Sequence, residues 1–208
     1  MHPQQEKWNR RYRNSDANRA SDGRPLLAAQ VLRDYLHLLP MHVFLENGKL
    51  SVKDKALDLA CGRGANALLL AQQGLQVSAW DIADVALQQL QHTAAQQQLL
   101  IETQQRDILQ SPPQPGSFDV IVVSYFLERS LFPILQAALK SQGLLFYQTF
   151  TAEKCVEQGP NNPDYLLGPN ELLQLCAGMR VLAYREEGRV GDCSQGLRNE
   201  AMIVAQRL

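Results

Sequence analysis

The sequence predicts an α/β fold built on a doubly wound sheet. Two features of the 208-residue chain carry this expectation. In residues 56–74 a short apolar run leads into a turn with two glycines and then into apolar residues at helical spacing. Later apolar runs also end at polar side chains, at Asp81, Asp107 and Ser124. Because open α/β sheets bind ligands at the carboxyl ends of their strands, these features predict a ligand site at that edge.

The first 40 residues are expected to form an N-terminal helical lid or cap. Residues 6–12 predict a helix that carries Trp8 and Tyr12 on one face, because the two are four positions apart. This helix either packs its aromatic rings on the body of the protein or folds over the cofactor. Residues 14–24 are polar and predict a mobile loop.

The next two segments are a helix and a connection. Pro25 opens a helix whose broad apolar stripe ends at Pro40. Residues 41–55 are interpreted as an irregular connection. The alternative is a hairpin, since Asn47 and Gly48 lie between two apolar runs.

The glycine turn at residues 62–67 allows two classes of ligand. Its sequence fits G-x-G-x-x-A, the dinucleotide fingerprint, in which a pyrophosphate docks at the start of the helix. Asp58, four positions before Gly62, opposes this interpretation, because its carboxylate would face a phosphate of the same charge. A cationic ligand reverses the sign of this interaction. S-adenosylmethionine carries an ammonium and a sulfonium and no phosphate, so it is the preferred cofactor.

The chain after this turn alternates strands and helices. The predicted strands are residues 76–80, 101–106, 118–124 and 144–150, and the predicted helices are residues 84–98 and 131–140. Residues 118–124 are almost continuously apolar, as a central parallel strand requires. Asp84 is the candidate N-cap of the first of these helices.

Residues 151–208 are expected to form a substrate-side loop and a C-terminal β-hairpin. The loop covers residues 151–169, and loops of that length in compact domains are usually functional or disordered. Asn170 is expected to cap a short helix over residues 171–177. The strands of the hairpin are residues 179–187 and 200–206.

Four motifs resemble those of the class I S-adenosylmethionine-dependent methyltransferases. Residues 58–64 resemble motif I, an acidic residue followed by a glycine-rich turn, with Ala60 in place of the first glycine. Residues 78–81, 106–108 and 118–124 resemble the motifs of the second, third and fourth strands. Within that superfamily the chain is most similar to the tellurite-resistance, TehB-type methyltransferases. Shared features are an Ala-Trp-Asp second strand, a Glu-Leu helix before the sixth strand and a short basic end.

The resemblance implies a Rossmann-like, seven-stranded mixed sheet in the order 3-2-1-4-5-7-6, with helices on both faces. It also implies one methyltransferase domain over residues 1–208, with a cofactor-binding core at residues 56–150. Asp81 lies near the offset at which an acid meets ribose hydroxyls, and Asp107 is placed to accept from the amine of adenine. The predicted cofactor-binding residues are Trp8, Tyr12, Asp58, Ala60, Cys61, Gly62, Arg63, Gly64, Asn66, Asp81, Ile82, Arg106, Asp107, Ile108, Ser124, Tyr125 and Phe126.

Methyl transfer from a sulfonium is an in-line displacement in which orientation supplies roughly 7–11 kcal/mol. A thiolate or oxyanion acceptor needs no general base, so no catalytic residue is named. Arg129 follows the fourth strand and is suited to clamp an anionic acceptor, or else it pairs with Glu128 or another surface acid. The predicted substrate-side residues are Arg129, Tyr147, Thr149 and Tyr165. The expected acceptor is a small molecule, such as a thiol or an oxyanion like tellurite.

Composition narrows the classes of partner that the chain is expected to bind. The formal net charge is −1, which gives no electrostatic footprint for nucleic acid, and no apolar run approaches a membrane span. The polar start is unlike a signal peptide, so a cytoplasmic monomer or homodimer is expected. Cysteines are expected to be reduced, and neither they nor the four histidines form a metal-ligand pattern.

Two other functions stay open at this point. A nicotinamide-dependent oxidoreductase is supported by the G-x-G-x-x-A match, although no hydride-transfer constellation accompanies it. A binding module that holds S-adenosylmethionine without methylating anything also fits the motifs.

Overall fold

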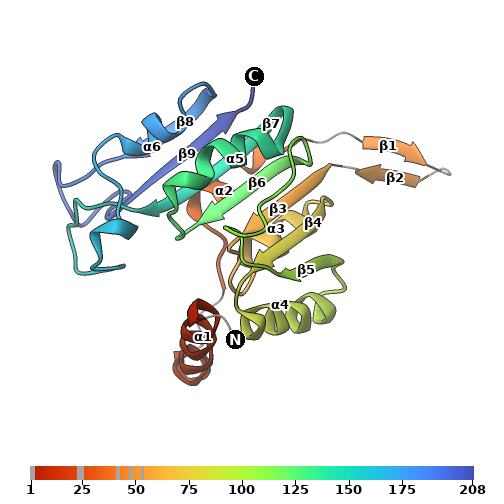
Figure 1. The fold of residues 1–208 in the computed structure, drawn as a ribbon, viewed down its shortest axis with the longest axis horizontal. Coiled ribbons are helices and arrows are strands. Elements are labelled where there is room, and N and C mark those ends of the chain that lie inside the picture. Colours follow the sequence, from red (N-terminus) through yellow and green to blue (C-terminus); the bar gives the residue numbers. More distant parts are fainter. Residues whose placement is uncertain (1–2, 23–25, 41–42, 47–48, 53) are drawn as a thin grey trace. The chain divides into compact units, whose positions relative to one another are not determined.

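The computed structural model describes residues 3–22, 26–40, 43–46, 49–52 and 54–208. Its main sheet has seven strands in the order β5-β4-β3-β6-β7-β9-β8 (Figure 1). This order confirms the predicted mixed, Rossmann-like sheet. The chain divides into two compact units. One comprises Met1–Ala29 with Pro40–Pro112, and the other comprises Gln30–Leu39 with Pro113–Leu208.

The first unit holds three parallel strands and the helices that follow two of them. The strands are β3 (Lys55–Leu59), β4 (Gln76–Asp81) and β5 (Ile101–Gln105), and the helices are α3 (Ala65–Gln72) and α4 (Asp84–Gln96). Ala56, Leu57 and Leu59 on β3 are fully buried, as expected of a strand covered on both faces.

Helix α1 (Pro3–Asp22) is longer than the sequence predicts. The segment expected to be a polar loop is helical as far as Asp22, since it contains neither proline nor glycine before Gly23. Helix α1 lies beside α4 (Figure 1). Hydrogen bonds from Gln5 and Asn9 to Asp84 hold it there.

A hairpin occupies the segment for which an irregular connection was expected. Strands β1 (Val43–Glu46) and β2 (Lys49–Val52) pair antiparallel as a separate two-stranded sheet. The preferred interpretation was therefore wrong, and the alternative, pairing of the two apolar runs, is what forms. The turn residues Asn47 and Gly48 lie outside the described residues.

The second unit holds both parallel and antiparallel strands. They are β6 (Phe118–Ser124), β7 (Leu139–Phe150), β8 (Arg180–Glu186) and β9 (Glu200–Gln206). Strand β6 pairs parallel with β7, and β9 pairs antiparallel with both β7 and β8. Helices α2 (Gln30–Asp34), α5 (Phe132–Ala138) and α6 (Glu171–Leu175) pack against β7 or β9. The antiparallel placement puts the start of β9 beside the end of β7, at Glu200 and Phe150.

Two short helices differ from their predicted form. The helix expected from Pro25 to Pro40 is reduced to α2 and a 3₁₀ turn, Leu36–Leu38. The side-chain oxygen of Asn66 accepts a hydrogen bond from the backbone N–H of Ala29 at 2.8 Å, so this N–H is bonded outside a helix.

Asn170 holds the predicted N-cap position of α6, but it lies in the left-handed region with φ 58° and its side chain makes no capping hydrogen bond. The carboxylate of Glu171 instead accepts from the backbone N–H of Gly168 at 2.7 Å. Among the described residues, no helix combines the length and the apolar character needed to cross a membrane.

Candidate functional site

The turn after β3 is shaped by three residues with positive φ. Ala60, Gly62 and Gly64 have φ values of 55°, 53° and 73°. The backbone N–H of Gly64 donates to the carbonyl of Cys61 at 2.8 Å and closes the turn. A Cβ on Gly62 would lie 2.7 Å from the hydroxyl of Tyr12, so a side chain at this position would displace Tyr12 and strain the backbone.

Asp58 lies under this turn and is fully buried. Its carboxylate accepts from the backbone N–H of Ala67 at 3.0 Å and from the amide of Asn66 at 3.3 Å. Burial raises the pKa of Asp58 to about 7 in spite of these hydrogen bonds. A carboxylate with so little solvation is stabilised by a nearby cation.

Asp81 ends β4 and joins the same turn. Its Oδ2 accepts from the backbone N–H of Gly62 and its Oδ1 from that of Ala83, both at 2.8 Å. Burial raises the pKa of this carboxyl as well. Each oxygen keeps a second lone pair, so these bonds leave the carboxylate able to accept from a ligand.

Tyr12 of α1 lies over the glycine turn. Arg63 donates from Nη2 to the carbonyl of Tyr12 at 3.1 Å and from Nε to Gln89 on α4 at 2.8 Å. The pKa of Tyr12 is raised, first by burial and then by the negative charge of Asp81. Trp8 stacks with Tyr12 at a centroid distance of 6.2 Å. The two predicted lid aromatics and the turn residues are therefore together in this unit.

The contact that holds α1 on α4 was not predicted. Gln5 and Asn9 both donate to Oδ1 of Asp84, at 3.0 and 2.6 Å, and Asn9 accepts from the backbone N–H of Val85 at 3.3 Å. Asp84 is thus the first residue of α4 and not its cap, which is Ala83. The signal was present in the spacing, since Gln5, Asn9 and Tyr12 fall on one face of a helix.

The end of β5 supplies the predicted third-strand residues. The guanidinium of Arg106 stacks 3.8 Å above the ring of Trp80 on β4. Asp107 accepts from the backbone N–H of Leu109 at 3.0 Å, and Ile108 beside it is buried. The carbonyl of Ile82 accepts a long bond of 3.5 Å from Gln105.

In the second unit, Ser124 ends β6 and Tyr125 follows with φ 56°. The backbone N–H of Tyr125 donates to the carbonyl of Gln148 on β7 at 2.9 Å. The carbonyl of Phe126 accepts from the hydroxyl of Tyr147 at 2.5 Å. The cofactor roles of these residues stay predictions.

Arg129 is engaged by the loop that follows β7. Its guanidinium forms a double hydrogen bond with Glu171, at 2.5 and 3.0 Å, and donates to the carbonyls of Asp164 and Leu166 at 2.8 and 2.9 Å. The expected alternative was a pair with Glu128 or another surface acid, and the acid that pairs is Glu171. The geometry favours loop anchoring, while the acceptor role of Arg129 stays a prediction.

The other predicted substrate-side residues differ in exposure. Tyr147 is buried and stacks on Phe132 at 4.8 Å, and Thr149 is buried too. Tyr165 ends a 3₁₀ turn, Pro163–Tyr165, and is exposed.

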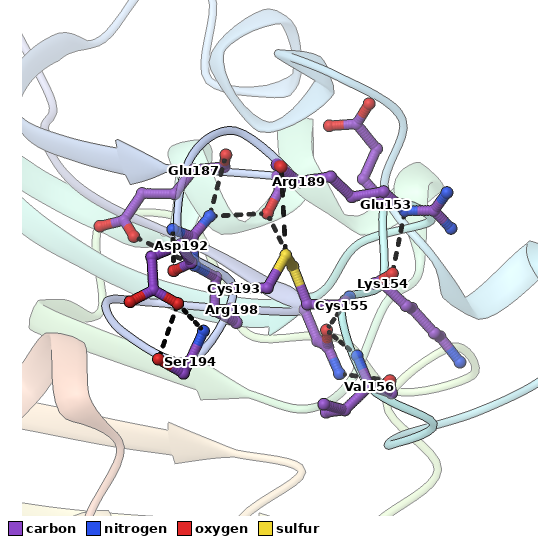
Figure 2. Close-up of a disulfide and its surroundings, with 12 residues drawn as sticks. Glu153, Lys154, Cys155, Val156, Glu187, Arg189, Asp192, Cys193, Ser194 and Arg198 are labelled. Atoms are coloured by element: carbon purple, nitrogen blue, oxygen red, sulfur yellow. Dashed lines mark hydrogen bonds and ion pairs between the residues drawn. A yellow bond between two sulfur atoms is a disulfide. The ribbon is translucent and has the colours of Figure 1, made fainter.

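Cys155 and Cys193 form a disulfide, contrary to the expectation of reduced cysteines (Figure 2). The two lie 38 positions apart, in the loop after β7 and the loop between β8 and β9. The two cysteines are too far apart in the sequence for their spacing to predict the bond. Cys61 and Cys176 are free and buried.

Hydrogen bonds secure both loops around the disulfide (Figure 2). Arg198 donates to the carbonyls of Gly188 and Asp192, at 3.0 and 2.9 Å. Asn199 accepts from the backbone N–H of Cys155 at 2.7 Å and donates to the carbonyl of Val156 at 2.8 Å. In the part of the chain that the structure describes, no group of three metal-binding side chains gathers.

Comparisons with known proteins show what this chain is similar to. Residues 56–143 match a family model described as a methyltransferase domain. YqeM of Bacillus subtilis, provisionally named a methyltransferase, is 27% identical over 119 residues, which cover 53% of this chain and 48% of YqeM. The match thus spans about half the length of that curated relative.

Solved structures share the fold. TehB of Haemophilus influenzae matches with a TM-score of 0.67 at 20% identity, covering 91% of this chain and 65% of TehB. A SAM-dependent methyltransferase of Aquifex aeolicus matches with a TM-score of 0.58 at 16% identity, covering 77% and 85% of the two chains. The findings confirm the predicted resemblance: residues 56–143 match a methyltransferase domain, and TehB shares the fold.

Proposed function

We propose that this chain, which carries a class I S-adenosylmethionine-dependent methyltransferase domain resembling TehB, transfers a methyl group to a small-molecule acceptor. One observation carries the proposal: a fully buried carboxylate, Asp58, under a turn whose two glycines have positive φ. Its pKa of about 7 reflects poor solvation, which a cationic ligand offsets and a phosphate worsens. The residues present therefore fit S-adenosylmethionine better than a dinucleotide.

The cofactor contacts follow from the strand ends. Asp81 accepts from the ribose hydroxyls through its remaining lone pairs, and Asp107 accepts from the adenine amine. The backbone of Gly62 and Gly64 lets the ligand approach closely. Tyr12 on α1 covers the turn as part of a lid.

When bound, S-adenosylmethionine supplies a methyl group on a sulfonium that is already a good leaving centre. The chain then contributes mainly by orienting the acceptor and excluding water. A thiol or a chalcogen oxyanion such as tellurite is the acceptor that the TehB-type resemblance suggests. A formal net charge of −1 supports a small acceptor over a nucleic acid. A cytoplasmic monomer or homodimer remains the expectation for location and assembly.

Calorimetry with S-adenosylhomocysteine and with NAD tests the cofactor. We expect S-adenosylhomocysteine to bind and to raise the melting temperature, and NAD to do neither. Binding of NAD alone would contradict the proposal and restore the oxidoreductase. Binding without turnover in a screen of thiols, amines and oxyanions would instead indicate the non-catalytic module.

Hydrogen exchange with and without S-adenosylhomocysteine tests the lid. We expect added protection in α1, above all near Trp8 and Tyr12. Equal protection of residues 6–22 in the two states would show that α1 is a fixed packing helix.

A further inference from the structure

Helix α1 is attached to the first unit through polar side chains. Of the α1 side chains that the structure describes, residues 4–14, only that of Asn9 is buried. Gln5 and Asn9 donate to Oδ1 of Asp84 at 3.0 and 2.6 Å, and Asn9 also accepts from the backbone N–H of Val85 at 3.3 Å. These bonds lower the pKa of Asp84, so both amides bind an ionised carboxylate. The described part of α1 is thus held by hydrogen bonds rather than by a buried apolar side chain.

An attachment of this kind opens at a modest cost in free energy. When Gln5 and Asn9 leave Asp84, water replaces the lost hydrogen bonds, because water reaches the half-buried Asp84. The net contribution of such bonds to stability is therefore much smaller than their strength without water. Segments with few buried apolar contacts are the ones that open locally while the rest of a protein stays folded. Helix α1 is accordingly able to leave α4 without unfolding the strands of the unit.

Further along α1, Tyr12 covers the glycine turn. Its hydroxyl lies 2.7 Å from the position that a Cβ on Gly62 would take, so it fills the space left by the missing side chain. The charge of Asp81 contributes to the raised pKa of Tyr12, which places the two groups close together. The backbone of Gly62 and the carboxylate of Asp81 are the groups proposed to meet the cofactor. In this conformation Tyr12 therefore covers the face that a ligand would approach.

Arg63 of the turn holds the same end of α1. Its Nη2 donates to the carbonyl of Tyr12 at 3.1 Å, and its guanidinium lies over the ring of Tyr12, 5.9 Å from the centroid. Its Nε donates to Gln89 on α4 at 2.8 Å. One side chain thus connects the turn with both helices. Arg63, α1, α4 and the turn all belong to the first unit.

We propose that Asp84 is a positioning residue for cofactor exchange. It latches α1 over the glycine turn, and the latch opens each time S-adenosylmethionine enters or S-adenosylhomocysteine leaves. Asp84 acts through α1 and not through contact with the cofactor. The inference rests on the proposed function, since it takes the glycine turn as the cofactor site.

The latch acts on rate constants rather than on affinity. Gln5, Asn9 and Asp84 make the same contacts whether the turn is empty or occupied, and a contact that is equal in two states shifts no equilibrium between them. The same contacts lower the population of the open state, through which the ligand passes in both directions. Loss of the latch therefore raises the association and dissociation rate constants by one common factor and leaves Kd nearly unchanged.

The test uses the full-length protein with the variants Asp84→Ala, Asp84→Asn and Gln5→Ala. The matched control is Glu102→Ala, because Glu102 is a carboxylate of the same unit that also accepts two side-chain hydrogen bonds, from Ser78 and Gln104. Gln5→Ala keeps the carboxylate at the start of α4, so it tests the latch even if Asp84→Ala destabilises that helix.

Binding of S-adenosylhomocysteine is followed by stopped-flow fluorescence. The chain has two tryptophans, Trp8 on α1 and Trp80 on β4, and both belong to the first unit. We expect Asp84→Ala to raise both rate constants about tenfold, with Kd within about threefold of wild type. Asp84→Asn should fall between the two, because its amide oxygen still accepts from both donors. Glu102→Ala should match wild type.

Hydrogen exchange of the ligand-free protein supplies a second readout, which a purely structural role would not link to the binding rates. Amides in residues 8–14 should exchange faster in Asp84→Ala by the factor that the rate constants gain, because both processes pass through the open state. Gln5→Ala alone should give a smaller gain. It should add nothing to Asp84→Ala, since the second substitution removes a bond that the first has already lost.

Two results would overturn the latch and leave the proposed function standing. One is unchanged rate constants in Asp84→Ala and Gln5→Ala. The other is weaker binding that arises from faster dissociation alone, which would show that the carboxylate stabilises only the occupied state. Failure of the wild-type protein to bind S-adenosylhomocysteine would instead refute the proposed function, and this inference with it.

Discussion

The two units hold their strand-end carboxylates in different ways. In the first unit Asp58 and Asp81 accept from backbone N–H groups of Ala67, Gly62 and Ala83. In the second unit Glu200 is held by two side chains, those of Gln148 and Tyr125. A cradle of main-chain N–H donors is set by local turn geometry. A cradle of side-chain donors can be changed by substituting one residue at a time.

The difference separates a fixed arrangement of donors from an adaptable one. A backbone cradle would suit the proposed cofactor, whose structure never varies. A cradle of side chains is adaptable, because substitutions alter it without disturbing the fold. The predictions below test how far this division holds.

Loss of the disulfide should have the largest effect, and it should be confined to the stability of the second unit. Closing a loop between residues 38 positions apart restricts the unfolded chain by about 4 kcal/mol. Cys193→Ser should lower the free energy of unfolding by roughly 2–4 kcal/mol in denaturant titrations. The control is Cys176→Ala, which removes a buried free thiol and no bond. Equal losses in the two variants would show that the disulfide contributes no constraint of its own.

The backbone cradle should fail when its turn gains a side chain. Gly62→Ala places a Cβ 2.7 Å from the hydroxyl of Tyr12 at a position with φ 53°. We expect about 100-fold weaker binding of S-adenosylmethionine by calorimetry, or about 2.7 kcal/mol. Gly116→Ala is the control, because it has φ 64° and open space around it. If both variants bind normally, the turn is not the cofactor site.

Removing one carboxylate from the cradle should cost less than distorting the turn. Asp81→Ala should weaken cofactor affinity about tenfold or more, since a hydrogen bond to a charged group contributes roughly 1.5–3 kcal/mol. Asp119→Ala is a suitable control, because Asp119 belongs to the second unit and pairs with Lys140 on β7. Unchanged affinity in Asp81→Ala would remove the ribose assignment.

Asp58 should make the free energy of unfolding depend on pH. Its folded pKa of about 7 lies above the ordinary aspartate value, so the folded protein keeps a proton that the unfolded chain releases. This contribution is complete below the unfolded pKa of about 4 and is lost as pH rises to about 7, at no more than about 1.4 kcal/mol per pH unit. Asp58→Asn should flatten that part of the profile. An unchanged slope would show that Asp58 is ionised throughout.

The same division explains what the sequence could predict. The turn residues from Asp58 to Gly64 follow from a local pattern, in which glycines and an acidic strand end lie within a few positions, and the strand order follows from the family resemblance. The cluster of Tyr125, Gln148 and Glu200 joins three segments far apart in the chain. Each of these residues alone has an ordinary type and spacing.

Other differences have the same origin in distant contacts. Gln5 and Asn9 of α1 donate hydrogen bonds to Asp84. The polar composition that suggested a loop therefore belongs to a helix that is bound through its polar side chains. The helix expected after Pro25 is shortened at Ala29, whose N–H donates a hydrogen bond to the side chain of Asn66. The disulfide depends on two loops meeting, which spacing alone does not encode.

Asn199 gives the loop after β7 a second attachment that does not depend on oxidation. It binds the backbone of Cys155 and Val156 and has φ 62°, a conformation that asparagine tolerates well. A lone cysteine forms no bond, so relatives of this protein should gain or lose Cys155 and Cys193 as a pair. Asn199 should persist in both groups, because it keeps the chain before Glu200 in place whether or not the sulfur bridge is inherited.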